Sequence, residues 1–315
     1  MYESRVLIPY ELKAWDSLNH SIMTKKNAYA LILFFFPVLV FLSLLYAGFV
    51  WDDYRNFVGN PRISVISISN FLWFFKSLEY DNYFPFTWIS IALDYALWEK
   101  NPSGFHLTNI VLHSVNAVIL FFLILEVLGK FILSKVKNIT ASFFAAMLFA
   151  VHPLRTETVA WISTRGDLLC AIFLQISFIF YIGYSKNESK KKYILSLIFC
   201  LASFFCRPWA FLFPIVLLLY DLAFREKPDI SIKKKILEKI PFLALSAIFA
   251  IPALMSRGGG MRGISEHGLF ARLIQTFYNF YFYAEKTLVP SGLSPLYPFA
   301  SFTASSPKFI VPAVL

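Results

Sequence analysis

Two adjacent carboxylates, Asp52 and Asp53, directly follow the first long apolar stretch of the chain, residues 28–50. A carboxylate that is partly removed from water at the mouth of a helical bundle can take a proton from a hydroxyl group. The same two acids would also be ordinary at a solvated helix end, where a loop begins. We therefore treat both as candidate catalytic residues, with the solvated loop as the alternative.

A polar stripe runs along the apolar stretch 105–128, where His106, Asn109, His113 and Asn116 recur at intervals that share one helical face. Polar side chains at membrane depth are costly, so they point toward a cavity or a partner helix. Lining of a donor-headgroup cavity and hydrogen bonding between helices both fit the spacing. The two histidines are roughly 10 Å apart along a helix, which is too far for neighbouring metal ligands, and no metal site is predicted.

A short polar segment between two later apolar stretches carries further candidates: His152, Arg155, Glu157, Trp161, Arg165 and Asp167. Arginine suits phosphate because its planar guanidinium binds two oxygens at once. Arg155, Arg165 and the later Arg207 are therefore candidate ligands of a donor phosphate. The candidate cavity-lining residues are His152, Glu157 and Asp167, and mutual salt bridges within the segment are the alternative.

The overall composition indicates a membrane protein. Hydrophobic residues make up 58% of the chain and charged residues 15%, against about 45–50% and 25% in a soluble domain. The net charge of +10 lies mostly in short loops between apolar blocks, which fits lipid headgroups rather than nucleic acid. The three cysteines lack metal-type spacing, so neither a disulfide framework nor a zinc site is predicted.

The apolar blocks predict an all-α, polytopic helical bundle with about 7–8 transmembrane helices. The blocks are residues 28–50, 105–128, 139–151, 168–184, 193–205, 209–223 and 236–255, and residues 269–289 are either an eighth span or an interfacial helix. Within the first outer loop, residues 51–104, two amphipathic pieces at 66–78 and 86–98 are expected to lie along the membrane surface.

The ends of the chain divide it further. Residues 1–27 are expected to form a cytoplasmic N-terminal segment, in which 1–22 read as an extension upstream of a start at Met23. The remainder, 28–315, reads as one transmembrane domain. It ends at 309–315 in what resembles the beginning of another span, which indicates truncation.

Basic residues predict the orientation. Fifteen lysines and arginines lie at Lys25 and Lys26, in 130–137, in 186–192 and in 225–239. Such clusters favour the cytoplasmic side. Asp52 and His152 are therefore expected on the extracytoplasmic side.

Ordered motifs along the chain resemble a known family. FVWDDYRN at 49–56 and NPRI at 60–63 resemble the first outer loop of the transmembrane and tetratricopeptide-repeat O-mannosyltransferases, members of the GT-C superfamily. The resemblance continues in LDYALW at 93–98, NP at 101–102, FHLTNIVLH at 105–113, HPLRTE at 152–157, VAWIS at 159–163 and RGDLL at 165–169. Weaker similarity is found in LLLYD at 217–221 and LSPLY at 293–297.

The resemblance implies an inverting glycosyltransferase that moves a sugar, mannose in the named family, from a polyprenyl-phosphate carrier to an acceptor hydroxyl outside the cytoplasm. It implies that Asp52 is the general base beside Asp53, and that Arg165 and Arg207 face the lipid phosphate. The implied partners are membrane lipid, the lipid-linked sugar donor and a protein or glycan acceptor. No cofactor beyond the donor is implied, and a divalent metal requirement stays open.

The chain departs from the family pattern at three points. YFPF at 83–86 stands where relatives often have Tyr-Arg-Pro-Leu, and CRP at 206–208 stands where they often have Ser-Lys-Glu. The tetratricopeptide array is absent from the sequence. These departures keep open a catalytically inactive membrane scaffold, and the polar stripe keeps open a transporter or flippase for a lipid-linked substrate.

Overall fold

The structure is a computed structural model that describes residues 4–78, 83–132, 134–225, 231–255, 269–294 and 297. Across these ranges every regular element is a helix, which confirms the all-α prediction. The predicted span at 309–315 lies outside the described residues. So do residues 226–230 of the lysine-rich segment and residues 295–296 of the LSPLY motif.

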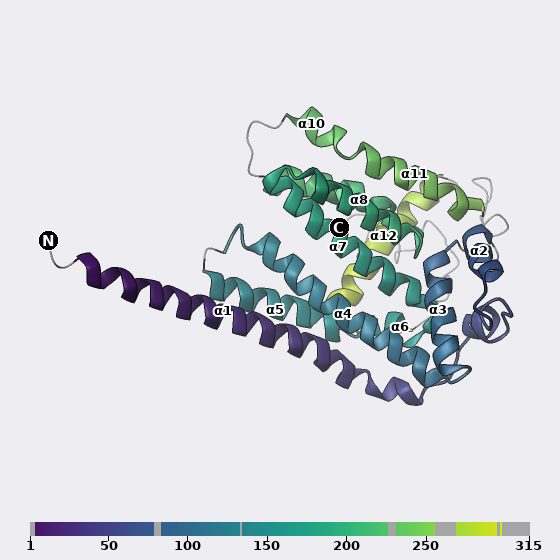
Figure 1. Cartoon of the computed structure of the whole chain (residues 1–315). Coiled ribbons are helices and arrows are strands. Elements are labelled where there is room, and N and C mark those ends of the chain that lie inside the picture. The colour runs from purple at the N-terminus through teal and green to yellow at the C-terminus, as the bar shows by residue number, and fades with distance from the viewer. Residues whose placement is uncertain are drawn as a thin grey trace.

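The bundle is built around two central helices, α4 (Pro102–Leu128) and α7 (Arg165–Asn187), which pack against each other (Figure 1). The outer helices α1 (Ser4–Val40) and α5 (Lys135–Val151) pack on α4, and α8 (Lys190–Phe204) packs on α7. The start of α4 is encoded locally, because Asn101 accepts a hydrogen bond from the Ser103 amide at 3.1 Å and Pro102 opens the first turn.

The predicted break at residues 207–208 is present. After α8 the chain forms a 3₁₀ helix, Pro208–Leu212, and then α9 (Phe213–Phe224), because proline is tolerated in a first helical turn but not in an interior. Two further helices follow, α10 (Ile232–Leu237) and α11 (Ile240–Met255).

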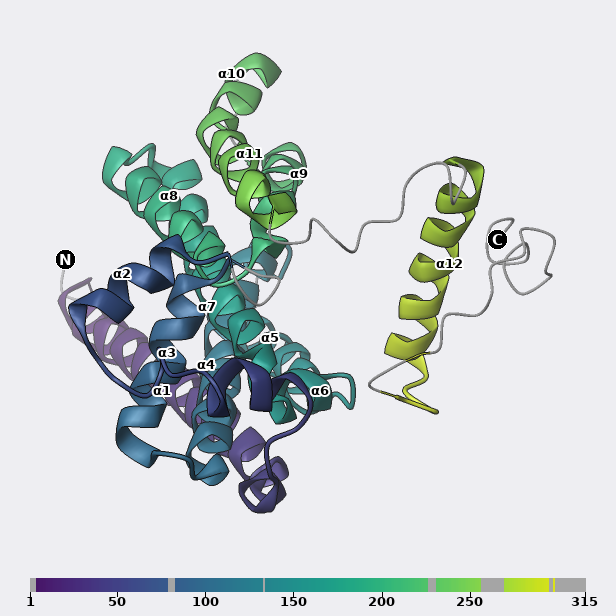
Figure 2. The same ribbon diagram turned by 90° about the vertical axis from the view of Figure 1, so that its right-hand side faces the viewer.

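Within the described ranges, four helices are long and apolar enough to cross a membrane: His20–Val40, Pro102–Leu128, Ile162–Asn187 and Ile232–Met255. They coincide with four of the predicted spans. The other predicted spans form shorter helices, namely α5 with 17 residues, α8 with 15 and the segment Pro208–Phe224. The last helix of the described part of the chain, α12 (Leu269–Leu288), has 20 residues but is not apolar enough to qualify, which favours its interfacial alternative. It stands apart from the bundle in Figure 2.

The first helix differs from its predicted range. It begins at Ser4, well before the apolar stretch, and its α-helical part ends at Val40 rather than at residue 50. Residues Leu42–Tyr46 tighten into a 3₁₀ helix, a common way to end a helix whose last carbonyls lack partners.

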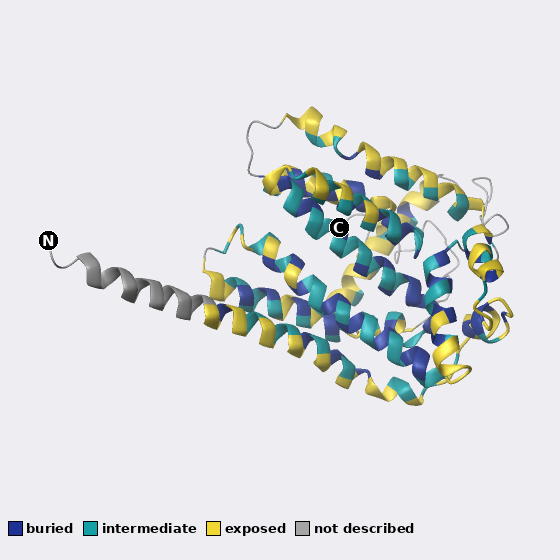
Figure 3. Cartoon of the chain, in the orientation of Figure 1, coloured by how far each residue is buried: buried dark blue, intermediate teal, exposed yellow. Residues whose placement is uncertain are grey.

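The outer helices carry many exposed positions, and the centre of the bundle is buried (Figure 3). Many of the exposed side chains are large and apolar. On α1, Leu31, Phe35 and Leu39 are each more than half exposed. Such a surface fits contact with lipid, since hydrocarbon chains solvate these side chains and water does not.

The outer loop forms a helical layer at one end of the bundle. It contains a π-helical turn, Tyr54–Val58, followed by α2 (Ile68–Lys76) and α3 (Pro85–Trp98), which match the two predicted amphipathic pieces. The short helix α6 (Arg155–Ala160) and the 3₁₀ turn Ile162–Thr164 lie at the same end. Trp88 of α3 is fully buried against Phe57 and Phe84, which joins the layer to the loop that carries the acid pair.

A buried ionic cluster lies toward the other end of α7. Asp221 of α9 accepts a hydrogen bond from Tyr181 of α7 at 2.6 Å and pairs with Lys239, before α11, at 2.5 Å. Arg225 adds a second cation 3.2 Å from the same carboxylate. The cluster joins α7, α9 and α11, and it contains the aspartate of the LLLYD motif.

Candidate active site

The two adjacent acids have different environments. Asp53 is fully buried; its Oδ1 accepts hydrogen bonds from the amide and the hydroxyl of Ser163, at 2.9 and 2.6 Å, and its Oδ2 accepts one from the Val50 amide at 3.1 Å. Asp52 is exposed and has no hydrogen-bond or ion-pair partner among the described residues. Asp53 therefore fixes the loop, while the carboxylate of Asp52 is open to a ligand.

The chain turns sharply before the acid pair. Trp51 has a φ of 47°, a conformation that a bulky residue rarely adopts, and its ring packs edge-on against Trp161 at a centroid distance of 5.5 Å. Such strain is kept only where the surroundings fix it, and it is common at functional sites. The Trp51–Trp161 contact and the Asp53–Ser163 hydrogen bonds together attach this loop to the start of α7.

Burial is the main influence on the protonation of Asp53. It raises the pKa of this carboxyl above its ordinary value of 3.8, and the hydrogen bonds from Ser163 and Val50 oppose the rise. Asp53 consequently binds a proton more readily than a solvated aspartate. It is nevertheless better suited to be a neighbour of the base than the base itself, because it is fully buried and both of its carboxylate oxygens already accept hydrogen bonds.

Arg207 reaches the acid pair through Ser163. Its Nη2 donates to the Ser163 carbonyl at 3.2 Å, and its Nε lies 3.1 Å from Oδ1 of Asp167, which also accepts from the Trp209 indole at 2.9 Å. The close approach depends on Gly166, where a Cβ would lie 2.7 Å from the backbone carbonyl of residue 206. The Arg207 side chain remains 15% exposed, so this cation lies at the edge of the site.

Arg165, by contrast, is enclosed. Its side chain has no exposure and pairs with the buried Asp94 at 2.5 Å. Its Nε donates to Asn109 and its Nη2 to the Phe105 carbonyl, both at 2.8 Å. The guanidinium is thus committed to protein groups. The predicted contact with a donor phosphate stays a prediction, and it would require this ion pair to open.

Asp94 was not selected from the sequence as a site residue. Its Oδ1 accepts a hydrogen bond from the Thr108 hydroxyl at 2.8 Å, and its burial raises its pKa while Arg165 opposes the rise. The available signal was an acid inside the apolar stretch 86–98, because a charge in such a place needs a partner. Ser163 carried no comparable signal.

The polar stripe lies on the buried face of α4, as its spacing predicts. His113 Nε2 lies 2.8 Å from the Ala150 carbonyl, and the Asn116 amide donates to the Leu168 carbonyl at 3.0 Å. The side-chain amide of Asn109 donates to the Val159 carbonyl at 3.2 Å, and Nε2 of His106 lies 3.4 Å from the Gly48 carbonyl oxygen. These contacts join α4 to its neighbours and favour the interhelical alternative over a cavity lining.

The remaining candidates lie nearer the surface. Nε2 of His152 is 3.0 Å from the Thr287 carbonyl of α12, and the Arg155 guanidinium lies over the Phe149 ring at 5.3 Å. Glu157 is exposed. Among the described residues, no group of three or more His, Cys, Asp or Glu side chains is arranged to hold a metal ion.

Comparison with curated proteins gives a consistent set of relatives. The chain is 31% identical over 176 residues to the protein O-mannosyl-transferase F38B6.6 of Caenorhabditis elegans, an alignment of 53% of this chain and 24% of the relative. It is 34% identical over 160 residues to human TMTC4, covering 46% of this chain and 21% of the relative. Drosophila melanogaster Tmtc1 is 29% identical over 180 residues, 55% of this chain and 20% of that protein.

The match is partial on both sides. The aligned part spans about a quarter or less of these curated relatives. No family model and no solved structure matches the chain significantly. The motifs nevertheless identify the relatives correctly: this chain is similar to the TMTC-family protein O-mannosyl-transferases, at about 30% identity over about half of its length.

Proposed function

We propose that this chain is a membrane glycosyltransferase of the O-mannosyltransferase type. It moves a sugar, mannose by analogy with the names of its relatives, from a polyprenyl-phosphate carrier to a hydroxyl on the extracytoplasmic face. The observation that carries the proposal is the asymmetry of the acid pair: Asp53 is anchored on Ser163, and Asp52 beside it is exposed.

In the proposed reaction Asp52 is the general base. The acceptor oxygen bonds to the anomeric carbon from the face opposite the phosphate, and its proton passes to Asp52. The bond from that carbon to the phosphate oxygen breaks, and its electron pair leaves with polyprenyl phosphate, so the anomeric configuration inverts. Removal of the proton is the step that the protein must supply, because a neutral hydroxyl is a weak nucleophile.

Negative charge grows on the leaving phosphate, and a nearby cation stabilises it. We assign this role first to Arg207. Its partly exposed guanidinium donates to the carbonyl of Ser163, and the hydroxyl of the same serine donates to the anchored Asp53. Arg155 is the second candidate, held over Phe149 at the same end of the bundle. Arg165 supports the site from within through its pair with Asp94.

The test is a transfer assay with the purified full-length protein and a panel of polyprenyl-phosphate sugars. Asp52→Asn keeps the shape of the side chain and removes the base, so turnover should fall about 10²–10⁴-fold with donor affinity little changed. Asp53→Asn should cost less, because the amide oxygen can still accept from Ser163. Glu126→Gln, an exposed acid paired with Lys186, is the matched control and should leave turnover unchanged.

The outcomes separate the alternatives. Full activity of Asp52→Asn refutes the assigned base. A wild-type protein that is inactive toward every donor favours the inactive scaffold. Movement of donor across a vesicle membrane without transfer favours a flippase.

A further inference from the structure

Exposed lysines gather at the end of the bundle opposite to the acid pair. Figure 1 shows that α5, α8 and α10 all begin at this end, whereas α2 and α3 lie at the other. The first turn of each of the three helices carries lysines. Those that are exposed and whose side chains have no hydrogen bond or ion pair within the described part of the chain are Lys135, Lys137, Lys190, Lys191, Lys233 and Lys234.

Several acids of this end are already held by other basic groups. Asp221 and Glu238 both pair with Arg225, on the inner side of the bundle. Glu126, which is partly exposed, pairs with Lys186 at 2.5 Å. The exposed lysines therefore keep an excess of positive charge, and a surface of this kind attracts anions from outside the chain.

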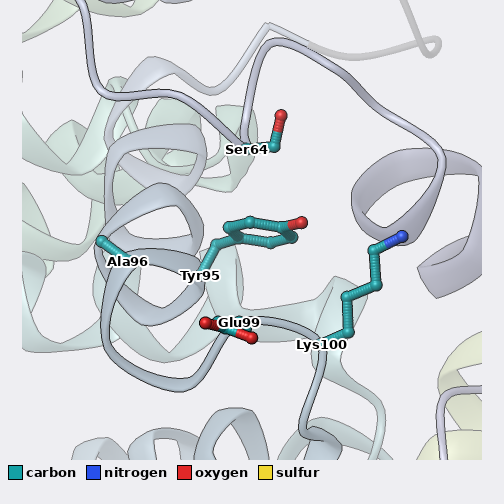
Figure 4. A pocket seen from close by; sticks show the side chains of 5 residues that line it. All are labelled: Ser64, Tyr95, Ala96, Glu99 and Lys100. Carbon is teal, nitrogen blue, oxygen red and sulfur yellow. The ribbon is translucent and has the colours of Figure 1, made fainter.

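At the opposite end, exposed acids and lysines are mixed. Lys100 lies beside Glu99 on the rim of a hollow in the outer layer (Figure 4). Asp52 and Glu157 are further exposed acids of that end. The excess of exposed positive charge is thus a property of the lysine-rich end and not of the whole surface.

On two helices a lysine is followed by an apolar stripe. On α8, Lys190, Ile194 and Ile198 recur every four residues, which places them on one helical face, and both isoleucines are more than half exposed. On α10, Lys233 precedes Leu237 by the same interval, and Leu237 is 50% exposed. The stripe on α8 extends about 12 Å along the helix, with its ammonium group at the end of the bundle.

The two helices are joined beside these lysines. The hydroxyl of Tyr193, one turn after Lys190, donates to the Glu238 carbonyl at 2.7 Å. Glu238 directly follows α10 and lies five residues after Lys233. Both stripes therefore begin within two helical turns of the same interhelical contact, which fixes the two lysines relative to the bundle.

We propose that the stripes Lys190–Ile194–Ile198 and Lys233–Leu237 bind anionic phospholipid, an inference that does not rest on the proposed transfer reaction. An anionic lipid carries a phosphate head above its acyl chains, and each stripe offers an ammonium group above apolar surface in the same order. Phosphatidylcholine fits less well, because its own ammonium group cancels its phosphate. A soluble acidic protein would reach the lysines and leave the isoleucines uncovered.

The experiment uses the full-length protein in vesicles of phosphatidylcholine and phosphatidylserine at a ratio of roughly 4:1, with a photoreactive group in the acyl chain of either lipid. Phosphatidylserine should cross-link to residues 190–198 and 232–240 of the wild-type protein about fivefold more than phosphatidylcholine does, since each lysine near a membrane surface attracts anionic lipid. Lys190→Gln/Lys233→Gln should lower that preference to about twofold or less. Concentrated salt should weaken it in the wild type, because exposed charges are screened.

Lys76→Gln/Lys100→Gln is the matched control. It removes the same number of exposed positive charges from the opposite end and should keep the full preference. The lysines at 191, 192 and 234 remain in the test variant, so the orientation signal of this end is retained.

Three results would overturn the proposal: equal cross-linking of both lipids to the wild type, an unchanged preference in Lys190→Gln/Lys233→Gln, or cross-links confined to other helices. Displacement of the photoreactive phosphatidylserine by a polyglutamate peptide, but not by unlabelled phosphatidylserine, would assign the lysines to an acidic protein instead. Sugar transfer has no part in this measurement, so failure of the proposed function would leave the lipid result unaffected.

Discussion

Replacing Arg165 with alanine separates a structural role from a role in donor binding. In the structure this guanidinium is fully buried, pairs with Asp94 at 2.5 Å and donates to Asn109 and the Phe105 carbonyl at 2.8 Å. The substitution would leave the Asp94 carboxylate buried without its cation. A structural role therefore predicts a large loss of stability, whereas direct phosphate binding predicts a loss of donor affinity.

The size of the loss follows from the contacts. Breaking a buried ion pair by removing one partner typically costs about 3–5 kcal/mol, because the other charge stays in a poorly solvated place. Asp94 keeps one hydrogen bond, from Thr108, so we expect the unfolding free energy to fall by about 3 kcal/mol, toward the lower end of that range.

The assay is chemical unfolding in detergent, combined with donor binding measured per folded molecule. Asp94→Leu/Arg165→Met is the matched control, since replacing both partners by apolar residues is often nearly neutral. Stability within about 1 kcal/mol of the wild type, the average effect of a point substitution, together with lost donor binding would refute the structural role. Such a result would favour direct binding of the donor phosphate by Arg165.

Three further predictions concern the polar stripe, the buried Asp53 and the membrane topology. His113→Leu should lower stability by about 1 kcal/mol with donor binding unchanged; weaker donor binding at unchanged melting temperature would restore the cavity lining. Burial raises the pKa of Asp53 above 3.8, so the folded chain binds this proton more tightly and the unfolding free energy should fall as pH rises from 3.8 through the raised value. Asp53→Asn should make the unfolding free energy depend less steeply on pH, as measured by denaturation at a series of pH values. An unchanged pH dependence would contradict the assignment to Asp53. Cysteines placed at Val58 and Ser189 should be labelled from outside intact cells at position 58 only; labelling at 189 alone would reverse the topology.

Much of the fold was predictable because its signals are local. The apolar blocks predicted where helices form, since a segment that cannot satisfy its backbone with water must do so within a helix. The Asn101-Pro102 start and the Arg207-Pro208 break needed only neighbouring residues. The polar stripe on α4 was placed on one face by spacing alone, and the structure buries that face.

What could not be predicted is the choice of partner. Arg165 was predicted to be a phosphate ligand because the sequence shows the type of a side chain but not its exposure. Its pair with Asp94 could not be predicted, since the two residues are far apart in the chain. The contact of Asp53 with Ser163 spans 110 positions, and serine is too common to mark such a contact. The ends of helices within apolar sequence could not be predicted either, because no residue type marks them. The α1 helix ends ten residues before its apolar stretch does.

The acid pair shows how neighbouring residues of one type acquire different roles. A general base must be ionised and accessible, but it must also be positioned, and an exposed aspartate on a flexible loop would satisfy only the first two conditions. Asp53 supplies the third condition, because three hydrogen bonds hold its carboxylate to the start of α7 and to Val50. The cost of burying Asp53 appears in its raised pKa, while Asp52 remains exposed to solvent. Two adjacent acids are therefore useful where one would not be, since anchoring and proton transfer place opposite demands on solvation.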